Sequence, residues 1–529
     1  MGSCCSSGFN SKFPNNVRLI KTSLISERVR VDNVRHQYRF MQIIGQGQYG
    51  VVREAQRRRD KQRVAVKSIA KRELQRDLTF MRRELDILQS VDHPNIIRLY
   101  ETYEDEKYLH IVVELCTGGE LLDRLLEKGM LSEAETAETL RYILSAVHHL
   151  HTLKIVHRDL KPENILFANT QSLADLKLAD FGLSCKFSNE ELKLSSFVGT
   201  PYYLAPEVIQ GKYGSQCDVW SIGVMMYFLL SGTQPFAASS VVEVMQKVLS
   251  GSYDFNGSVW QQVSREATDL ISKMLVTNPK TRITIPNVLQ HSWFSTMLSP
   301  KPIVVPLSML TSLKSSKAQN RLVKETVKLL VSMTTREDIE QLKQFFHVLD
   351  TEQTGFITVP SLERALERCG IQLAIGEVQS KVHAEIIAAN DYGSGRIKYS
   401  DFLASILSMQ DFLDEEAIWA AFKHFDTVMK NKTGSGLISA EDIKSALEQN
   451  ACLLTDDELV EILSHFNLTK ESKLNFETYR AMIECFQEEA SHDASFTPLR
   501  VTKMRSKSFS YETLVERSAK LALNSSKAM

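Results

Sequence analysis

Residues 157–164 read His-Arg-Asp-Leu-Lys-Pro-Glu-Asn and bring three chemically useful side chains close together. Asp159 can accept a proton from a hydroxyl group, Lys161 can balance charge on a moving phosphoryl group, and Asn164 can ligate magnesium. A protein that catalyses phosphoryl transfer needs these three functions. Such a short motif is weak evidence by itself, so its interpretation depends on companion motifs elsewhere in the chain.

A glycine-rich segment lies upstream of this loop. Residues 45–52 follow the pattern G-x-G-x-x-G-x-V, in which glycines let a strand–turn–strand close over phosphates where a Cβ atom would collide. The pattern could also belong to a dinucleotide-binding fold. That fold would begin a helix at the point where Val51 and Val52 continue a strand. The segment therefore predicts a hairpin that covers phosphates.

The next predicted strand, residues 64–67, carries Lys67 among apolar neighbours. A buried ammonium group needs an anionic partner. Glu84 lies on a predicted helix, residues 80–88, and could provide it, although it could also be an ordinary surface carboxylate. The order of strand, lysine, helix and glutamate favours a Lys67–Glu84 pair.

Further motifs follow the first loop in the expected order. Asp180-Phe181-Gly182 ends a short predicted strand, Ala205-Pro206-Glu207 closes the next loop, and Arg282 lies far downstream. With these motifs, residues 38–294 resemble a complete serine/threonine protein kinase catalytic domain. The resemblance implies a bilobal α+β fold, and ATP and Mg²⁺ as cofactors.

The resemblance also assigns roles to individual residues. Asp159 would be the catalytic base, and Asn164 and Asp180 would be the magnesium ligands. Thr200 would lie in the loop beside the substrate, and together with Lys161 it favours serine or threonine over tyrosine as the acceptor. The nucleotide would contact residues of the glycine-rich hairpin, the lysine strand, the hinge and the pocket floor, namely Ile44, Gly45, Gly47, Gly50, Val52, Ala65, Lys67, Glu114, Cys116 and Leu166.

Glu120 and Glu163 stand where related kinases bind basic residues upstream of the phosphorylated site. Together they predict substrates with basic residues before the serine or threonine. The alternative is that both glutamates are solvated surface residues without a role in substrate binding. A different class of protein, a scaffold that keeps the kinase fold without its chemistry, would show a change at Lys67, Asp159 or another core position. The sequence shows no such change.

Composition limits the other possibilities. The chain has 529 residues, 43% hydrophobic and 24% charged, which predicts two to four soluble domains. A net charge of −1 gives no reason to expect a nucleic-acid partner. The 8 cysteines show no C-x-x-C spacing, which argues against zinc ribbons and against a secreted disulfide framework. No apolar segment approaches the length of a membrane-spanning helix. An intracellular protein is expected.

The first 37 residues form a leader with an acylation pattern. Gly2 would be exposed after removal of Met1 and would carry myristate, and Cys4 and Cys5 could carry palmitate as the second signal that stable anchoring needs. A disordered leader without lipid is the alternative. The pattern predicts a protein at the cytoplasmic face of a membrane and partly in the cytosol.

The chain after the kinase-like region divides into three parts. Residues 295–340 form a basic junction with an amphipathic helix that could bind a calmodulin-like groove or block the substrate cleft. Residues 341–487 contain four segments of helix, 12-residue loop and helix, which resemble an all-α domain of four EF-hand-like units. Residues 488–529 form a basic, serine-rich tail. The whole chain looks like a calcium-dependent protein kinase of the plant and protist type.

The four loops depart from the calcium-binding pattern, which needs oxygen ligands at positions one, three and five and a bidentate glutamate at position twelve. No loop has that glutamate. The first loop offers Asp350, Glu352 and Thr354 but ends in Ser361. The third loop, after a five-residue insertion that follows Asp426, offers Asn431, Thr433 and Ser435 and ends in Asp442.

The loops therefore leave two alternatives for the regulatory half. It is either a fixed or partner-responsive module, or a weak calcium sensor at one or two loops, with the first and third the best candidates. The sequence predicts a serine/threonine protein kinase regulated by this half through the junction helix. A calcium-independent member of the family and a membrane-bound scaffold are the alternatives.

Overall fold

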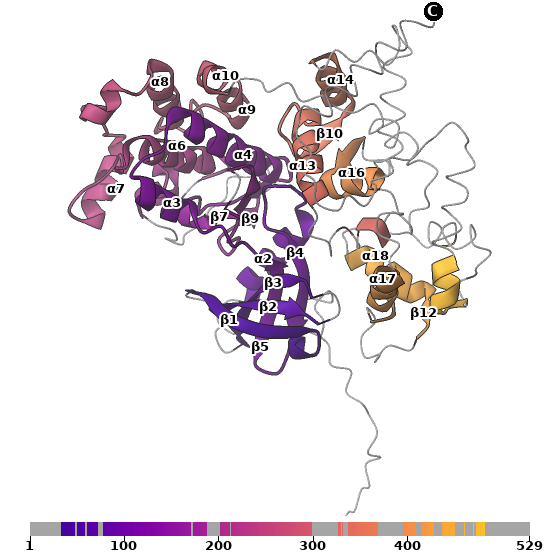
Figure 1. Cartoon of the computed structure of the whole chain (residues 1–529). Coiled ribbons are helices and arrows are strands. Elements are labelled where there is room, and N and C mark those ends of the chain that lie inside the picture. The colour runs from indigo at the N-terminus through magenta and orange to yellow at the C-terminus, as the bar shows by residue number, and fades with distance from the viewer. Residues whose placement is uncertain are drawn as a thin grey trace, which may run out of the picture.

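The computed structural model describes residues 33–47, 50–58, 61–71, 78–170, 173–187, 201–211, 213–298, 326–328, 331, 337–368, 395–407, 415–427, 436–449, 460, 469 and 472–481. Figure 1 shows a small lobe built on a sheet, a helical large lobe, and a C-terminal half beside them. Within the described residues, no helix is long and apolar enough to cross a membrane.

The small lobe is a five-stranded antiparallel sheet in the order β1-β2-β3-β5-β4, preceded by η1 (Val34–His36) and accompanied by helix α2. In β3, Lys67 lies opposite Val52 of β2 and Ile111 of β5, so a central strand carries the lysine. The elements are β1 (Tyr38–Gly47), β2 (Gly50–Arg57), β3 (Arg63–Ala70), α2 (Leu78–Ser90), β4 (Leu99–Glu104) and β5 (Tyr108–Glu114).

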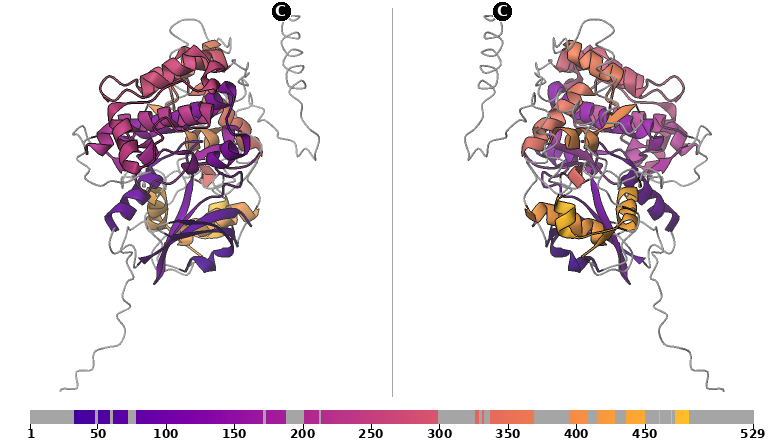
Figure 2. Two further views of the ribbon diagram at one scale, coloured as in Figure 1. Left: turned by 90° about the vertical axis from the view of Figure 1, so that its left-hand side faces the viewer. Right: turned by 90° about the vertical axis from the view of Figure 1, so that its right-hand side faces the viewer.

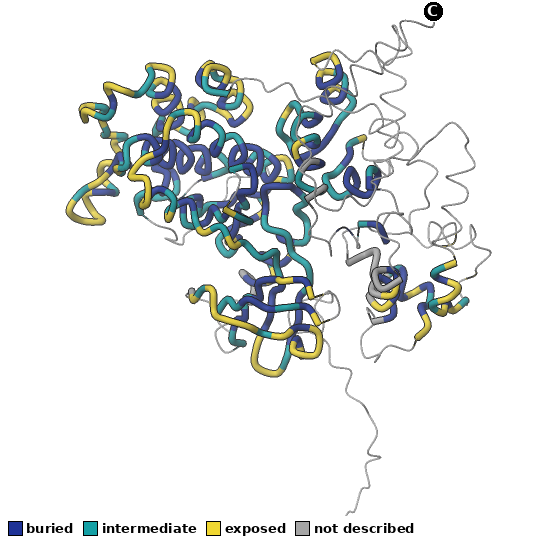
Figure 3. Tube along the Cα trace, viewed as in Figure 1, coloured by how far each residue is buried: buried dark blue, intermediate teal, exposed yellow. Residues whose placement is uncertain are grey.

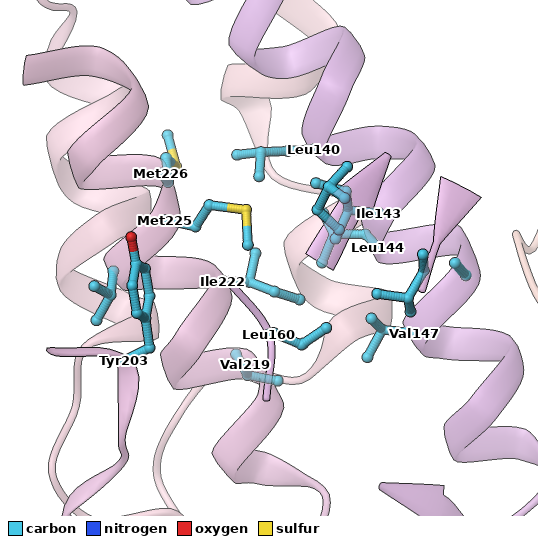
Figure 4. Packing of buried hydrophobic residues seen from close by; sticks show 14 of the residues in the cluster. Leu140, Ile143, Leu144, Val147, Leu160, Tyr203, Val219, Ile222, Met225 and Met226 are labelled. Carbon is cyan, nitrogen blue, oxygen red and sulfur yellow. The ribbon is translucent and has the colours of Figure 1, made fainter. Parts of the chain in front are cut away.

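The large lobe is organised around two helices, α4 (Glu133–Thr152) and α6 (Gln216–Ser231). Ser132 begins α4 with a capping box, and the helix is buried along most of its length because its apolar residues face α6 and the small ribbons. Figure 4 shows the apolar side chains of α4 and α6 meeting in one core, and Figure 3 shows how completely the two helices are covered.

Shorter elements surround this pair. Two antiparallel ribbons, β6–β9 and β7–β8, lie where the loops of the site begin and end. The remaining elements of the lobe are α3 (Leu121–Lys128), β6 (Ile155–Val156), η2 (Pro162–Asn164), β7 (Ile165–Phe167), η3 (Leu173–Asp175), β8 (Leu176–Leu178), β9 (Cys185–Lys186), η4 (Pro201–Tyr203), α5 (Pro206–Ile209), α7 (Val241–Ser250), η5 (Ser258–Gln261), α8 (Arg265–Met274), α9 (Ile285–Leu289) and α10 (Ser292–Met297).

The described residues of the C-terminal half form helices joined by loops, with two short ribbons. β10 pairs with β11 through Ile357 and Ile397, and β12 pairs with β13 through Ile438 and Leu474. Its described elements are α13 (Glu337–Leu349), β10 (Phe356–Thr358), α14 (Val359–Arg368), β11 (Arg396–Lys398), α16 (Tyr399–Ile406), α17 (Glu415–Thr427), β12 (Ile438–Ser439), α18 (Ala440–Gln449), β13 (Lys473–Leu474) and a helical turn at 476–481.

Glycines mark the turns of three of these loops. Gly355, Gly395 and Gly436 have φ values of 76°, 71° and 72°, a left-handed conformation that side chains with a Cβ rarely adopt. In the fourth loop a serine stands at this place, and the Ser472 hydroxyl instead accepts the Thr469 N–H at 2.9 Å. The side chain thus provides the turn that glycine provides elsewhere.

The described part of the junction is helical and packs into the core of the C-terminal half. Val327 and Val331 are buried there with the side chains of α13 and α17. The Thr326 hydroxyl lies 3.0 Å from the Tyr479 hydroxyl. The two described apolar residues of the predicted amphipathic helix therefore pack on this half, whereas its other apolar residues lie outside the described ranges.

Candidate active site

The loop between β6 and β7 brings together the three residues that the sequence singled out. The Lys161 ammonium group lies 2.8 Å from Asp159 Oδ2. The Asn164 amide donates to the same oxygen at 2.9 Å and to the Asp159 carbonyl oxygen at 2.7 Å. Two donors therefore hold the Asp159 carboxylate in one orientation while it stays partly exposed.

A buried carboxylate of helix α6 fixes the start of this loop. Asp218 Oδ2 accepts the His157 N–H at 3.0 Å, and Oδ1 accepts the Arg158 N–H at 2.9 Å. His151 donates from Nε2 to Oδ2 at 2.8 Å. Burial opposes ionisation of Asp218, but the hydrogen bond and charge of His151 keep its carboxyl pKa below the ordinary value. The catalytic loop is thus tied to the core.

Arg158 has a φ of 72°, a strained conformation for a residue with a side chain. Its guanidinium group donates to the Leu183 carbonyl oxygen and, at 2.9 Å, to the Tyr213 hydroxyl. These bonds and the Asp218 contact hold the strained backbone. The sequence motifs alone did not identify Asp218, although an ionisable residue in the first turn of a largely apolar helix could have indicated a functional position.

The lysine of β3 meets the predicted partner. Lys67 Nζ lies 3.0 Å from Glu84 Oε1 and 3.9 Å from Asp180 Oδ1. Asp180 has a φ of 59°, and its carboxylate is about half exposed to the cleft. The Phe181 ring is buried against His157, 5.1 Å between ring centroids. Lysine, glutamate and aspartate are therefore assembled around the same space.

The predicted nucleotide-contacting residues lie on β1, β2 and β3, at the end of β5 and just after it, and on β7. At Gly50 a Cβ atom would collide with the Ser68 carbonyl oxygen, so only glycine fits this close approach. Glu114 pairs with Lys177 at 2.8 Å, which ties the hinge to β8. Burial raises the pKa of the Cys116 thiol to about 12, so this thiol stays protonated. Ile44, Gly45, Gly47, Val52, Ala65 and Leu166 complete the set.

The two predicted substrate carboxylates interact with each other. Burial, then the negative charges of Asp123 and Glu163, raise the pKa of Glu120. Glu163 Oε2 is buried and has no hydrogen-bond partner among the described residues. Two mutually repelling carboxylates form a place that a cation would stabilise.

In the first loop of the C-terminal half, the Thr354 N–H donates to Asp350 Oδ1 at 3.1 Å, whereas Glu352 accepts a hydrogen bond from Arg364 at 2.6 Å. Asp350 Oδ2 accepts the Gly355 N–H at 2.6 Å. In the third loop, Asp426 Oδ2 makes the same kind of contact with the Gly436 N–H at 3.0 Å. Asp426, before the insertion, therefore makes the contact that Asp350 makes in the first loop, whereas the predicted loop start at Asn431 lies outside the described residues.

Several predicted residues lie outside the described ranges. These are Gly2, Cys4 and Cys5 of the leader, Thr200 of the kinase-like region, and Asn431, Thr433 and Ser435 of the third loop. The roles assigned to them stay predictions. Asp442 is described, and its Oδ2 accepts the Ser439 N–H and hydroxyl at 2.8 and 2.6 Å.

The sheet lobe, the helical lobe and the loop chemistry between them define a protein kinase catalytic domain. Residues 38–294 match the protein kinase domain family. Similar proteins include calcium-dependent protein kinase 34 of Arabidopsis thaliana, 36% identical over 86% of this chain and 85% of that protein. Calcium-dependent protein kinase SK5 of Glycine max is 36% identical over 90% of this chain and 91% of its own length. Calcium-dependent protein kinase 12 of A. thaliana is 37% identical over 86% of this chain and 91% of that protein.

The chain therefore belongs to the calcium-dependent protein kinase family. The predicted bilobal fold and the predicted serine/threonine protein kinase activity are confirmed. ATP and Mg²⁺ are the cofactors that a protein kinase domain implies, and proteins are its substrates.

We expect the Asp218→Asn substitution to lower kcat about 100-fold, because an amide cannot accept both backbone N–H groups and the catalytic loop would shift by a fraction of an ångström or more. The fall in kcat/KM should match the fall in kcat, as it does when an interaction made in the transition state is lost. Steady-state phosphorylation of a serine peptide measures both. The exposed Asp254→Asn substitution in the same lobe is the control, and an unchanged kcat in a folded Asp218→Asn protein would contradict the assignment.

Proposed function

We propose that this chain is an ATP- and Mg²⁺-dependent serine/threonine kinase with a preference for basic substrates. In this proposal a C-terminal half of four EF-hand-like units regulates the kinase, and N-terminal acylation holds it at the cytoplasmic face of a membrane. The observation that carries the proposal is the assembled Lys67–Glu84–Asp180 group facing the Asp159 loop.

The residues at the cleft fit the cofactor that the family implies. The half-exposed Asp180 carboxylate and the Asn164 side chain would hold Mg²⁺, and Lys67 would bind the phosphates of ATP. The close backbone approach at Gly50 suits a hairpin lying over those phosphates. Bound Mg²⁺ would neutralise charge that develops on the phosphates.

Asp159 and Lys161 would carry out the proton transfer and the charge stabilisation. Asp159 would accept the proton of the substrate hydroxyl, since Lys161 and Asn164 orient its carboxylate without covering it. Lys161 would then contact the transferring group, where a cation stabilises developing negative charge. A scaffold without activity is disfavoured because each of these contacts is in place.

The basic preference is supported by Glu120 and Glu163. Burial and the negative charges of Asp123 and Glu163 raise the pKa of Glu120, and a guanidinium group of the substrate would stabilise its charged form through charge-assisted hydrogen bonds. Because Glu163 Oε2 is buried without a partner among the described residues, it would gain most from such a donor.

The regulatory role of the C-terminal half is supported by its paired ribbons, its left-handed glycines and the junction residues in its core. A calcium ion fits best at the third unit. Asp426 stands at the first position there, and the buried Asp442 Oδ1 at the twelfth position has no hydrogen-bond partner among the described residues. An aspartate at that position reaches less far than glutamate, so weak binding is expected.

A calcium-independent kinase is the second candidate. In the first pair of units the described carboxylates already have protein partners: Glu352 pairs with Arg364 at 2.6 Å, and Asp401 pairs with Lys328 of the junction. The membrane proposal is supported by the sequence pattern at Gly2, Cys4 and Cys5.

We expect Glu120→Gln and Glu163→Gln each to lower kcat/KM for an arginine-containing serine peptide by roughly 10-fold or more, because a charge-assisted hydrogen bond contributes about 1.5–3 kcal/mol. A matched peptide with alanine in place of arginine should be little affected by either substitution. Glu127→Gln, an exposed carboxylate on α3, is the control.

Asp159→Asn provides the inactive reference in the same assay, with a loss of about 10²–10⁴-fold. Equal losses on both peptides in the Glu120→Gln and Glu163→Gln proteins would show that these carboxylates support the fold, not arginine recognition. Unchanged phosphorylation by Asp159→Asn would favour another catalytic base.

We expect calcium, titrated from chelator to millimolar at fixed Mg²⁺, to raise peptide phosphorylation only above about 10 μM, because no loop supplies a bidentate glutamate. Asp442→Asn should abolish the rise, and the neighbouring exposed Glu441→Gln should not. A flat but active profile would favour the calcium-independent kinase, and a rise that persists in Asp442→Asn would place the ion elsewhere.

We expect Gly2→Ala to move the protein from membranes to the soluble fraction, because palmitate usually follows myristate and one acyl chain alone anchors marginally. Substitution of both Cys4 and Cys5 by serine should give partial release. Flotation with lipid vesicles after expression in eukaryotic cells measures the bound fraction, and a Gly2→Ala protein that floats like the wild type would exclude acylation as the anchor.

A further inference from the structure

The first loop of the C-terminal half, residues 350–361, lies directly on helix α4 of the kinase. His148 donates from Nδ1 to the Gln353 carbonyl oxygen at 3.1 Å, and His149 donates from Nδ1 to the Thr354 carbonyl oxygen at 2.9 Å. The Phe356 ring lies against His149, 4.9 Å between ring centroids. Figures 1 and 2 show this part of the C-terminal half beside the large lobe.

The contact is close enough to exclude a side chain at the turn of the loop. A Cβ atom at Gly355 would collide with the imidazole of His149. That ring is held in its neutral form, since Nδ1 donates to the loop and Nε2 accepts the Asp92 N–H at 3.4 Å. Burial lowers the pKa of His149 to about 4, so it is neutral at pH 7.

Residues before and after the first loop in the sequence make two further polar contacts with the kinase. Lys343 of α13 pairs with Asp175 of η3 at 3.0 Å, with 4% and 3% of the two side chains exposed. In α16, the Ser400 hydroxyl and N–H donate to Asp92 Oδ2 at 2.7 and 3.0 Å. Removing one partner of a buried ion pair is costly, so the Lys343–Asp175 pair makes this contact specific.

Two positions that would supply ligands to a cation are committed to the protein in the first loop. Glu352, at the third position, binds Arg364 at 2.6 Å. Ser361, at the twelfth position, is fully buried and exchanges hydrogen bonds with Thr358 at the start of α14.

We propose that the first loop is a protein-binding element that docks on α4 without a metal ion, and that it holds the C-terminal half on the kinase at every calcium concentration. This inference rests on the proposed regulatory role of that half, and it assigns any calcium response to the other units. The loop surface that faces α4 consists of two backbone carbonyl oxygens and Phe356, which suit the two neutral histidines.

The contact reaches the active site through η3 and the β7–β8 ribbon. The side chain of Asn169 donates to Asp175 Oδ2 at 2.6 Å, and the Ala168 N–H donates to the Asp175 carbonyl oxygen at 2.9 Å. Asn164 and Asp180 flank the opposite end of the same ribbon, where Ile165 pairs with Leu178 and the Ala179 N–H donates to the Asn164 carbonyl oxygen at 2.9 Å. Lys343 is therefore a positioning residue for the ribbon, because it neutralises the buried Asp175.

Hydrogen–deuterium exchange of the full-length protein tests the docking directly. We expect the amide hydrogens of the first loop and of residues 173–177 to be equally protected in chelator and in 1 mM calcium. Lys343→Glu should speed exchange in both segments about tenfold, because it places a carboxylate against Asp175. Gln344→Glu places a carboxylate at the next, exposed position of α13 and should leave exchange unchanged.

Protection of the loop that appears only with calcium would overturn the proposal, as would equal exchange in the wild-type and Lys343→Glu proteins. Should Lys343→Glu not fold, Lys343→Met keeps the apolar stem of the side chain and should speed exchange in the same two segments. Exchange does not depend on catalysis, so a protected loop in a protein without kinase activity would refute the proposed function and leave the docking in place.

Calcium binding provides a second readout. Calorimetric titration of the wild-type and Asp350→Asn proteins with calcium should give the same stoichiometry, because the first loop takes no ion. Loss of one bound ion in Asp350→Asn would overturn the metal-free assignment. The kcat of Lys343→Glu should fall while the KM for ATP changes little, whereas a purely structural loss would lower the folded fraction and leave the kcat of the folded protein unaltered.

Discussion

The active site depends on one carboxylate that is buried in the large lobe. Asp218 is carried by α6, whose position is set by apolar packing against α4. Burying a carboxylate costs free energy, and three N–H donors aimed at Asp218 offset that cost. Because two of the donors belong to the backbone of the catalytic loop, the core places a loop that would otherwise have no fixed conformation. The polar geometry at Asp159 is therefore a consequence of hydrophobic packing.

The contact between the kinase and the C-terminal half follows the same principle. Asp175 and Lys343 are buried together, and Asp175 also receives the Asn169 amide, so no charge is left without a partner. The histidines of α4 contribute differently, because burial keeps them neutral and lets them donate to carbonyl oxygens. A surface of this kind is specific without an ion, since each donor has one acceptor at hydrogen-bonding distance.

Much of the kinase site could be predicted from the sequence because its motifs are local. Asp159, Lys161 and Asn164 lie within one loop, and the Lys67–Glu84 pair joins consecutive elements. The roles of Asp218 and Lys343 could not be predicted in this way. Each depends on which distant element lies opposite, and 60 residues separate Asp218 from Arg158 while 168 separate Lys343 from Asp175.

The third loop shows another limit of sequence patterns. A 12-residue template fits the stretch that begins at Asn431, but Asp426, five residues earlier, accepts the N–H of the left-handed Gly436, as Asp350 accepts that of Gly355 in the first loop. A template that counts residues cannot detect a hydrogen bond that spans an insertion. Loop length changes cost little free energy, so such an insertion is tolerated.

Hydrogen bonds at the N-termini of the helices that follow the loops can stabilise these units in the absence of the calcium-binding glutamate. The twelfth loop position is also the third residue of the following helix, where a side chain can share hydrogen bonds with the N-cap residue three positions earlier. Ser361 does so with Thr358, and Asp442 does so with Ser439. In the fourth unit, Asn475 accepts the N–H and hydroxyl of Thr478.

A glutamate at this position would serve both the helix and the ion, whereas serine, threonine or aspartate keeps the first role and weakens or loses the second. Helix capping is independent of calcium, so the fold of a unit can be retained after its affinity for the ion is lost. In addition to this helix capping, the first loop contacts the kinase, because the carbonyl oxygens beside its turn accept hydrogen bonds from α4. A loop that is freed from binding an ion can bind a protein surface instead.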